Sequence, residues 1–169
     1  FLGYHCTARL AALGADVTVL TRGRRPRSGA FARRVVTGDL ADREAVRSAL
    51  AGSTVVLDLA GASSAVSSNR DPVANVAEEL VPHLGLFVEA ARQAAPPRVV
   101  FVSSRLVYGA PRSLPVDENH PVCPNSAYAA HKLALEHHLG WLHAQEGLGT
   151  TVLRLANPYG ADHGGGGRS

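Results

Sequence analysis

Short apolar runs rich in β-branched residues alternate with helix-like stretches along this chain, and this alternation constrains the fold more than any other feature. The runs are nearly continuously apolar, as strands covered on both faces are. They span residues 16–21, 33–39, 54–61, 98–104 and 150–157. The helix-like stretches span residues 4–14, 42–52, 71–94 and 126–147. This alternation predicts an α/β doubly wound domain, with a parallel sheet and helices on both faces.

The helix-like stretches carry their own stop signals. Each ends at or near a glycine, or at the proline pair Pro96-Pro97. Pro82 lies inside the third stretch, so we expect that helix to kink or to begin afresh there.

Composition fits one globular domain. Of 169 residues, 46% are hydrophobic and 18% are charged, a balance that disordered chains lack. No apolar run approaches the roughly 20 residues that span a bilayer, and the opening residues lack the features of a secretory signal. Cys6 and Cys123 stand in unrelated contexts. These features predict a cytoplasmic protein with no disulfide, no zinc site and no membrane segment.

Two residue classes suggest other functions and are set aside. The basic cluster of Arg22, Arg24, Arg25 and Arg27 has no nucleic-acid-binding motif beside it, so we read it as a solvated loop and expect no nucleic-acid partner. His131, His137 and His138 lack the spacing and companions of a ligand set, so no metal is expected.

The chain opens just before a helix, whereas a doubly wound domain normally opens with a strand and a glycine-rich turn. We therefore expect the first strand to be absent. That strand would lie at the centre of the sheet, so its absence leaves two unpaired edges and an open core.

One constellation carries chemistry. Tyr128 and Lys132 are four residues apart on a predicted helix and share a face. Ser103 and Ser104 end an apolar strand, at the edge of a parallel sheet where ligands bind. A phenol has a pKa of about 10, so acting as a base near neutral pH needs a shift of roughly 3 units. A nearby ammonium supplies part of it, and a serine hydroxyl can orient a substrate hydroxyl or carbonyl.

Residues 103–109, 117–136 and 153–160 resemble the active-site blocks of extended short-chain dehydrogenases/reductases. The chain is most similar to UDP-glucose 4-epimerase-like members of the NAD-dependent epimerase/dehydratase family. This resemblance implies a Rossmann-like NAD(P)-binding domain over residues 1–169, with both ends of the enzyme missing and the C-terminal substrate-binding part absent.

The resemblance also assigns residues. It implies that Tyr128 is the acid/base, that Lys132 holds the nicotinamide ribose and lowers the pKa of the tyrosine, and that Ser104 hydrogen-bonds the reacting sugar hydroxyl. The implied cofactor contacts are Gly3, at the tail of the phosphate-binding turn, Asp39 and Leu40 at the adenine, Leu59, Ala60 and Gly61 on the nicotinamide side, and Pro158. Asn157 would contact a nucleotide-sugar, most simply a UDP-sugar. The implied reaction is C4 epimerisation, in which hydride passes from the sugar to NAD and returns to the opposite face.

Departures from the family pattern leave alternatives open. Thr21 replaces the acid that NAD users commonly carry, and Arg22 follows it, so NADP is an alternative to NAD. Asp58 stands where the family usually shows histidine, and Leu80 where many members place asparagine. Arg105 and Leu106 fill the positions of a dehydratase Asp-Glu pair, which argues against dehydration.

Other functions therefore stay in view. One is an NADP-dependent carbonyl reductase, and another is a non-catalytic remnant or dinucleotide-binding fragment. The helix that contains Trp141 often forms a dimer interface in the family, which implies a homodimer. Ser63, Ser64, Ser67 and Ser68 are read as a plain loop.

Overall fold

The computed structural model describes residues 1–23, 27–61 and 65–160. Its strands are β1 (Thr18–Thr21), β2 (Arg34–Thr37), β3 (Val55–Asp58), β4 (Arg98–Ser104) and β5 (Thr150–Leu155). Each lies inside one of the apolar runs, and β4 matches its run from end to end.

The helices cover the stretches between the strands. The α-helices are α1 (Leu2–Ala12), α2 (Arg43–Leu50), α3 (Ala65–Arg70), α4 (Pro72–Asn75), α5 (Val81–Ala91) and α6 (Ala127–Glu146). Short 3-10 helices, η1 (Arg27–Phe31) and η3 (Arg105–Tyr108), follow β1 and β4, and a π-helical turn, η2 (Val76–Leu80), precedes α5. None of the helices in the described ranges is long and apolar enough to cross a membrane.

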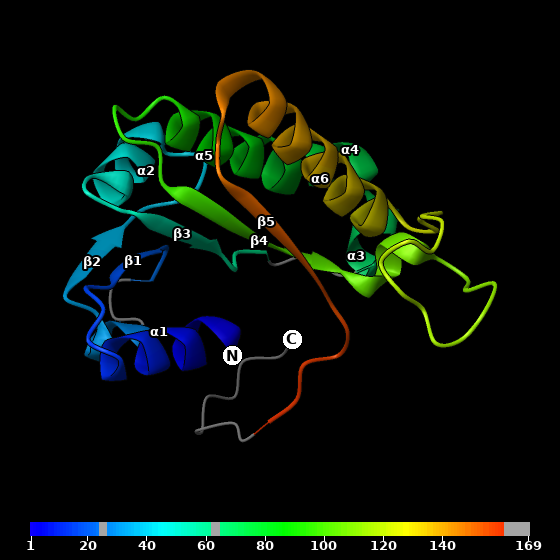
Figure 1. Cartoon of the computed structure of the whole chain (residues 1–169), viewed down its shortest axis with the longest axis horizontal. Coiled ribbons are helices and arrows are strands. Elements are labelled where there is room, and N and C mark those ends of the chain that lie inside the picture. Colours follow the sequence, from blue (N-terminus) through cyan, green and yellow to red (C-terminus); the bar gives the residue numbers. More distant parts are fainter. Residues whose placement is uncertain (24–26, 62–64, 161–169) are drawn as a thin grey trace.

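All strand pairs are parallel, and the strands form two sheets. β1 pairs with β2, while β4 lies between β3 and β5 in a three-stranded sheet. Helices α2, α5 and α6 cover one face and α1 lies on the other, as Figure 1 shows. The predicted α/β doubly wound fold is confirmed.

The break between the sheets lies where the sequence predicts a missing strand. Within the described residues no strand precedes α1, and β1 and β3 belong to different sheets. On β3, Val55 and Leu57 are 52% and 38% exposed, although their residue types belong in a core. The predicted unpaired edges and open core are therefore present.

The helical stretch over residues 71–94 is divided as Pro82 predicts. Asp71 caps α4 by accepting a hydrogen bond from the Ala74 amide. The chain then widens into the π-helical turn η2 before α5 starts with Pro82 in its first turn. Proline lacks an amide hydrogen and its ring crowds the carbonyl four residues before it, so the helix loosens directly upstream.

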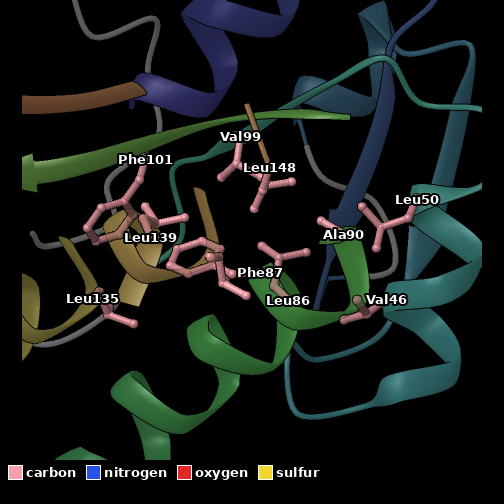
Figure 2. Close-up of a cluster of buried hydrophobic side chains, with 11 residues drawn as sticks. Val46, Leu50, Leu86, Phe87, Ala90, Val99, Phe101, Leu135, Leu139 and Leu148 are labelled. Atoms are coloured by element: carbon pink, nitrogen blue, oxygen red, sulfur yellow. The ribbon is translucent and has the colours of Figure 1, made fainter. Parts of the chain in front are cut away.

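The core lies between the three-stranded sheet and the helices α2, α5 and α6 (Figure 2). Phe87 on α5 and Phe101 on β4 are both fully buried and meet edge to face, with ring centroids 5.5 Å apart. Leu135 and Leu139 of α6 pack into the same cluster. This packing fixes α6 against β4. It thereby sets the position of the α6 residues that lie near the carboxyl end of β4.

Candidate active site at the carboxyl end of β4

Side chains from α3 hold the start of α6. Ser126 is the N-cap and accepts a hydrogen bond from the Ala129 amide at 3.2 Å. The Ala127 amide donates to Asn69 at 2.9 Å, and the Tyr128 amide donates to the Ser68 hydroxyl at 3.0 Å. The reading of Ser67 and Ser68 as a plain loop is wrong, because both lie on helix α3. No sequence motif marked Ser68 as a partner of α6.

Tyr128 and Lys132 share the face of α6 that meets β4. The Lys132 ammonium is buried, donates to the carbonyl oxygen of Val102 at 3.0 Å, and lies 4.6 Å from the ring centroid of Phe101. Its distance to the ring centroid of Tyr128 is 5.9 Å. The spacing of four residues thus brings the two side chains together, as the sequence predicts.

Ser104, rather than its neighbour Ser103, faces this pair. Ser104 ends β4, and its hydroxyl accepts a hydrogen bond from the Leu106 amide at 3.2 Å while also bonding the Tyr128 phenol. Ser103 is buried and donates to Glu136 instead. Because successive side chains of a strand point to opposite faces, one serine of the pair serves the site and the other serves the core.

The local environment disfavours the charged forms of both Tyr128 and Lys132. Burial raises the pKa of Tyr128, a hydrogen bond with Ser104 opposes that rise, and the negative charge of Glu79 adds to it. Burial lowers the pKa of Lys132, against the charges of Asp58 and Glu79. The groups of the chain thus hold the phenol protonated, whereas the family resemblance implies a tyrosine pKa lowered by Lys132.

A buried charged cluster adjoins the pair, and sequence reasoning missed it. Nδ1 of His83 donates to Asp58 at 2.6 Å, and its Nε2 lies 3.7 Å from a Glu79 carboxylate oxygen. Burial lowers the pKa of His83, but the hydrogen bonds to Asp58 and Glu79 outweigh it and raise the pKa to about 9. The spacing of Glu79 and His83 on a helix was the one available signal.

The residues expected to contact the cofactor lie mostly where strands end. Thr21 ends β1, and its hydroxyl accepts a hydrogen bond from the Gly23 amide at 3.2 Å. Arg22 lies 3.8 Å from Asp39, and both side chains are largely exposed. Leu40 packs on the core, while Gly3 lies in the first turn of α1.

The segment of Leu59, Ala60 and Gly61 follows β3 and lies against the charged cluster. The Ala60 amide donates to Asp58 at 3.2 Å. Gly61 has φ of +144°, and a Cβ there would lie 3.6 Å from the Glu79 carboxylate. The segment is therefore in contact with both carboxylates of the cluster.

The last described segment follows β5, whose final residue Leu155 pairs with Ser104 in the sheet. Asn157 and Pro158 follow β5 and are exposed. A Cβ on Gly160 would lie 3.3 Å from the ring of Phe1, the N-cap of α1. Arg24, Arg25, Ser63 and Ser64 lie outside the described residues.

Parallel sheets covered by helices, with a serine at a strand end facing a Tyr/Lys pair, define a Rossmann-type domain of the short-chain dehydrogenase/reductase superfamily. The chain belongs to the NAD dependent epimerase/dehydratase family, which it matches over residues 1–169. The predicted family is confirmed.

The proteins that this chain resembles carry out more than one reaction. The chain is 31% identical to UDP-glucose 4-epimerase of Bacillus subtilis, covering 95% of this chain and 51% of that protein. It superposes on UDP-glucose 4-epimerase from Brucella ovis in complex with NAD with a TM-score of 0.89 and 25% identity, covering 96% and 50% of the two chains. The match to TunA, an NAD-dependent NDP-hexosamine 5,6-dehydratase, has a TM-score of 0.73 and 26% identity over 91% and 50%. The chain thus spans about half the length of these relatives, and a substrate-binding part beyond residue 169 stays a prediction.

Proposed function

We propose that the protein containing this chain is an NAD(P)-dependent nucleotide-sugar epimerase that acts at the sugar C4 position. One observation carries the proposal: Ser104, Tyr128 and Lys132, from two elements of the fold, meet at the carboxyl end of β4. A hydroxyl hydrogen-bonded to a phenol, with an ammonium 5.9 Å from the centroid of the phenol ring, can bind and deprotonate an alcohol.

The chain offers groups that suit a dinucleotide. Lys132 supplies ammonium hydrogens for ribose hydroxyls, and Asp39 supplies a carboxylate that can accept from the adenine amine. The backbone of Leu59 to Gly61 would line the nicotinamide side, Gly3 the phosphates, and Pro158 the nicotinamide end. When bound, the nicotinamide supplies the acceptor and donor of hydride.

The residues of the protein handle the proton. Ser104 orients the sugar hydroxyl, and Tyr128 takes its proton as the carbonyl forms and returns it when the alcohol is restored. Lys132 holds the ribose and stabilises the phenolate. Because the chain alone raises the pKa of Tyr128, proton removal depends on positive charge held near the phenol.

A UDP-sugar is the proposed substrate, with Asn157 as a contact. The support comes from the names of the relatives, several of which are UDP-glucose 4-epimerases. TunA performs a dehydration instead. Arg105 and Leu106, which begin η3 directly after Ser104, offer no carboxylates for such a step, and this favours epimerisation.

A second candidate is an NADP-dependent reductase of a non-sugar carbonyl. Thr21 ends β1 without a carboxylate, and the Arg22 guanidinium lies exposed beside it. An arginine at this position can bind a 2′-phosphate, whereas an acidic residue there would bind the ribose hydroxyls of NAD.

The proposal includes a homodimer in the cytoplasm. Val73 and Val81, along α4 and α5, and Trp141 on α6 are exposed by 79%, 55% and 53%, and large apolar side chains on neighbouring helices suit a helix-to-helix interface. The two free cysteines, Cys6 and Cys123, suit a reducing compartment.

The test uses the chain expressed with the sequence that flanks it in its gene. Interconversion of UDP-glucose and UDP-galactose is followed with NAD and with NADP, for the wild type, Tyr128→Phe and the control Tyr4→Phe. We expect turnover that Tyr128→Phe lowers at least about 100-fold and that Tyr4→Phe retains. Reduction of a free ketone with NADPH, without sugar turnover, would support the reductase, and a folded protein that binds neither nucleotide would support the remnant.

A further inference from the structure

The charged cluster of Asp58, His83 and Glu79 extends from the protein interior to a small cavity. Asp58 and His83 are deeply buried, with side chains 1% and 3% exposed, while the Glu79 side chain is 15% exposed. Glu79 and His83 line a small cavity together with Asn75, Tyr128, His131 and Lys132. The cluster therefore begins at the end of β3, passes through α5, and brings its outermost carboxylate to the cavity that the Tyr/Lys pair shares.

Lys132 needs a counter-charge in this position. It is the only lysine in the sequence, it is 7% exposed, and its described hydrogen bond goes to the neutral carbonyl of Val102. A buried ammonium is costly unless it is paired or loses its proton. Glu79 and Asp58 are the carboxylates whose charges oppose that loss.

We propose that Glu79, anchored through His83 to Asp58, is a positioning residue that keeps Lys132 cationic and Tyr128 protonated in the ligand-free site. Its meaning for catalysis rests on the roles proposed for Tyr128 and Lys132. Asp58 also accepts a hydrogen bond from the Ala60 amide. It therefore connects the cluster to the segment expected to line the nicotinamide.

The surroundings of Tyr128 and Lys132 support a leading role for Glu79. The π-helical turn η2 contributes Glu79, α5 contributes His83, β3 contributes Asp58, and α6 contributes His131, whose Nδ1 lies 2.7 Å from Asn75. Strand β4 contributes the Val102 carbonyl and the Ser104 hydroxyl. Of these groups, Glu79 is the one whose charge raises the pKa of both Tyr128 and Lys132.

This role differs from a merely structural one in the direction of its effects. Loss of a negative charge lowers the pKa of both Tyr128 and Lys132, since both deprotonations become easier. If Glu79 only excludes water, its loss lets water reach both groups, and this lowers the pKa of Tyr128 but raises that of Lys132. The two pKa values thus shift in the same direction if Glu79 acts through its charge, and in opposite directions if it acts by excluding water.

The test titrates both groups by NMR in the intact protein, with 13C at lysine Cε and tyrosine Cζ and without nucleotide or sugar. Lys132→Arg and Tyr128→Phe assign the two signals. Glu79→Gln is compared with Glu78→Gln, which makes the same chemical change at an exposed position in η2. Glu79→Asp, which keeps the charge, is the rescue variant.

We expect Glu79→Gln to shift both titrations to lower pH, and Glu78→Gln and Glu79→Asp to leave them near the wild type. Opposite shifts, or none, would overturn the proposal. If Glu79→Gln does not fold, Glu79→Asn and Glu79→Asp, which share a side-chain length, carry the same comparison. Because the measurement needs no turnover, its failure leaves the proposed reaction untouched, and a protein without activity can still be titrated.

Discussion

The backbone amide of Tyr128 donates a hydrogen bond to the hydroxyl of Ser68, which is fully buried on α3. The proposed acid/base is therefore held in place by a short helix that lies about 60 residues earlier in the chain. Together with Asn69 and Ser126, Ser68 satisfies three amides at the start of α6 that a helix leaves without internal partners.

Replacing Ser68 with alanine leaves that amide without its partner. We expect Ser68→Ala to lower the free energy of unfolding by about 1–2 kcal/mol, measured by urea denaturation. Ser113→Ala, at an exposed serine in the loop after η3, serves as the control and should change it little. Equal stabilities of the two variants would show that Ser68 does not hold α6.

Gly109 is required by a close backbone approach. Its φ is +65°, and a Cβ there would lie 2.0 Å from the carbonyl oxygen of Cys123. We expect Gly109→Ala to destabilise the fold by at least about 3 kcal/mol, because a strained conformation and a backbone clash add. Gly147 has φ of +70°, but a Cβ there meets no described atom within 4 Å. Gly147→Ala should therefore cost only about 1–2 kcal/mol, and a similar loss at both sites would contradict this account.

Arg154 and Glu136 form a pair that joins β5 to α6. Their closest contact is 2.7 Å, and the side chains are 24% and 8% exposed. Glu136→Gln leaves the partly buried guanidinium of Arg154 without its counter-charge. It should lower the free energy of unfolding by about 3 kcal/mol. Asp16→Asn breaks the pair with Arg33, in which both side chains are 73% exposed, and should cost less than about 1 kcal/mol. Thermal unfolding of the two variants gives the comparison.

His83 makes stability depend on pH. Its pKa is raised from 6.5 to about 9, so the folded state binds a proton more tightly than the unfolded state does. The resulting stability is fully present below pH 6.5 and is lost as the pH rises through 9, roughly 3 kcal/mol in all. Urea denaturation of the nucleotide-free protein between pH 6 and 10 should show this loss, and a His83→Asn variant should lack it. A parallel decline in the variant would contradict the assignment.

Much of this fold follows from local pattern. The apolar runs locate all the described strands because the strands of a helix-covered parallel sheet are apolar nearly throughout, and this holds even for β3, where Val55 and Leu57 are exposed. Pro82 locates the start of α5. The Tyr/Lys pair follows from helical spacing, whereas the choice of Ser104 over Ser103 comes from the family resemblance.

Other features depend on contacts between distant segments. Asp58, His83 and Glu79 meet only because β3 ends beside the widened turn η2, and that turn is set by packing as well as by Pro82. Ser68 caps α6 from a helix that the serine-rich sequence conceals. The raised pKa of Tyr128 reflects burial and the charge of Glu79, which no spacing of residues within α6 could reveal.

The central claim is that Lys132 and its neighbours hold a nicotinamide dinucleotide, and calorimetry on the intact protein tests it most directly. NAD and NADP are titrated into the wild type, Lys132→Met and His137→Gln, an exposed position on the same helix. We predict that the wild type and His137→Gln bind one nucleotide alike, while Lys132→Met binds it at least about tenfold more weakly because a charged hydrogen-bond donor is lost. A folded wild type that binds neither nucleotide, or a Lys132→Met variant that binds as the wild type does, would contradict the account.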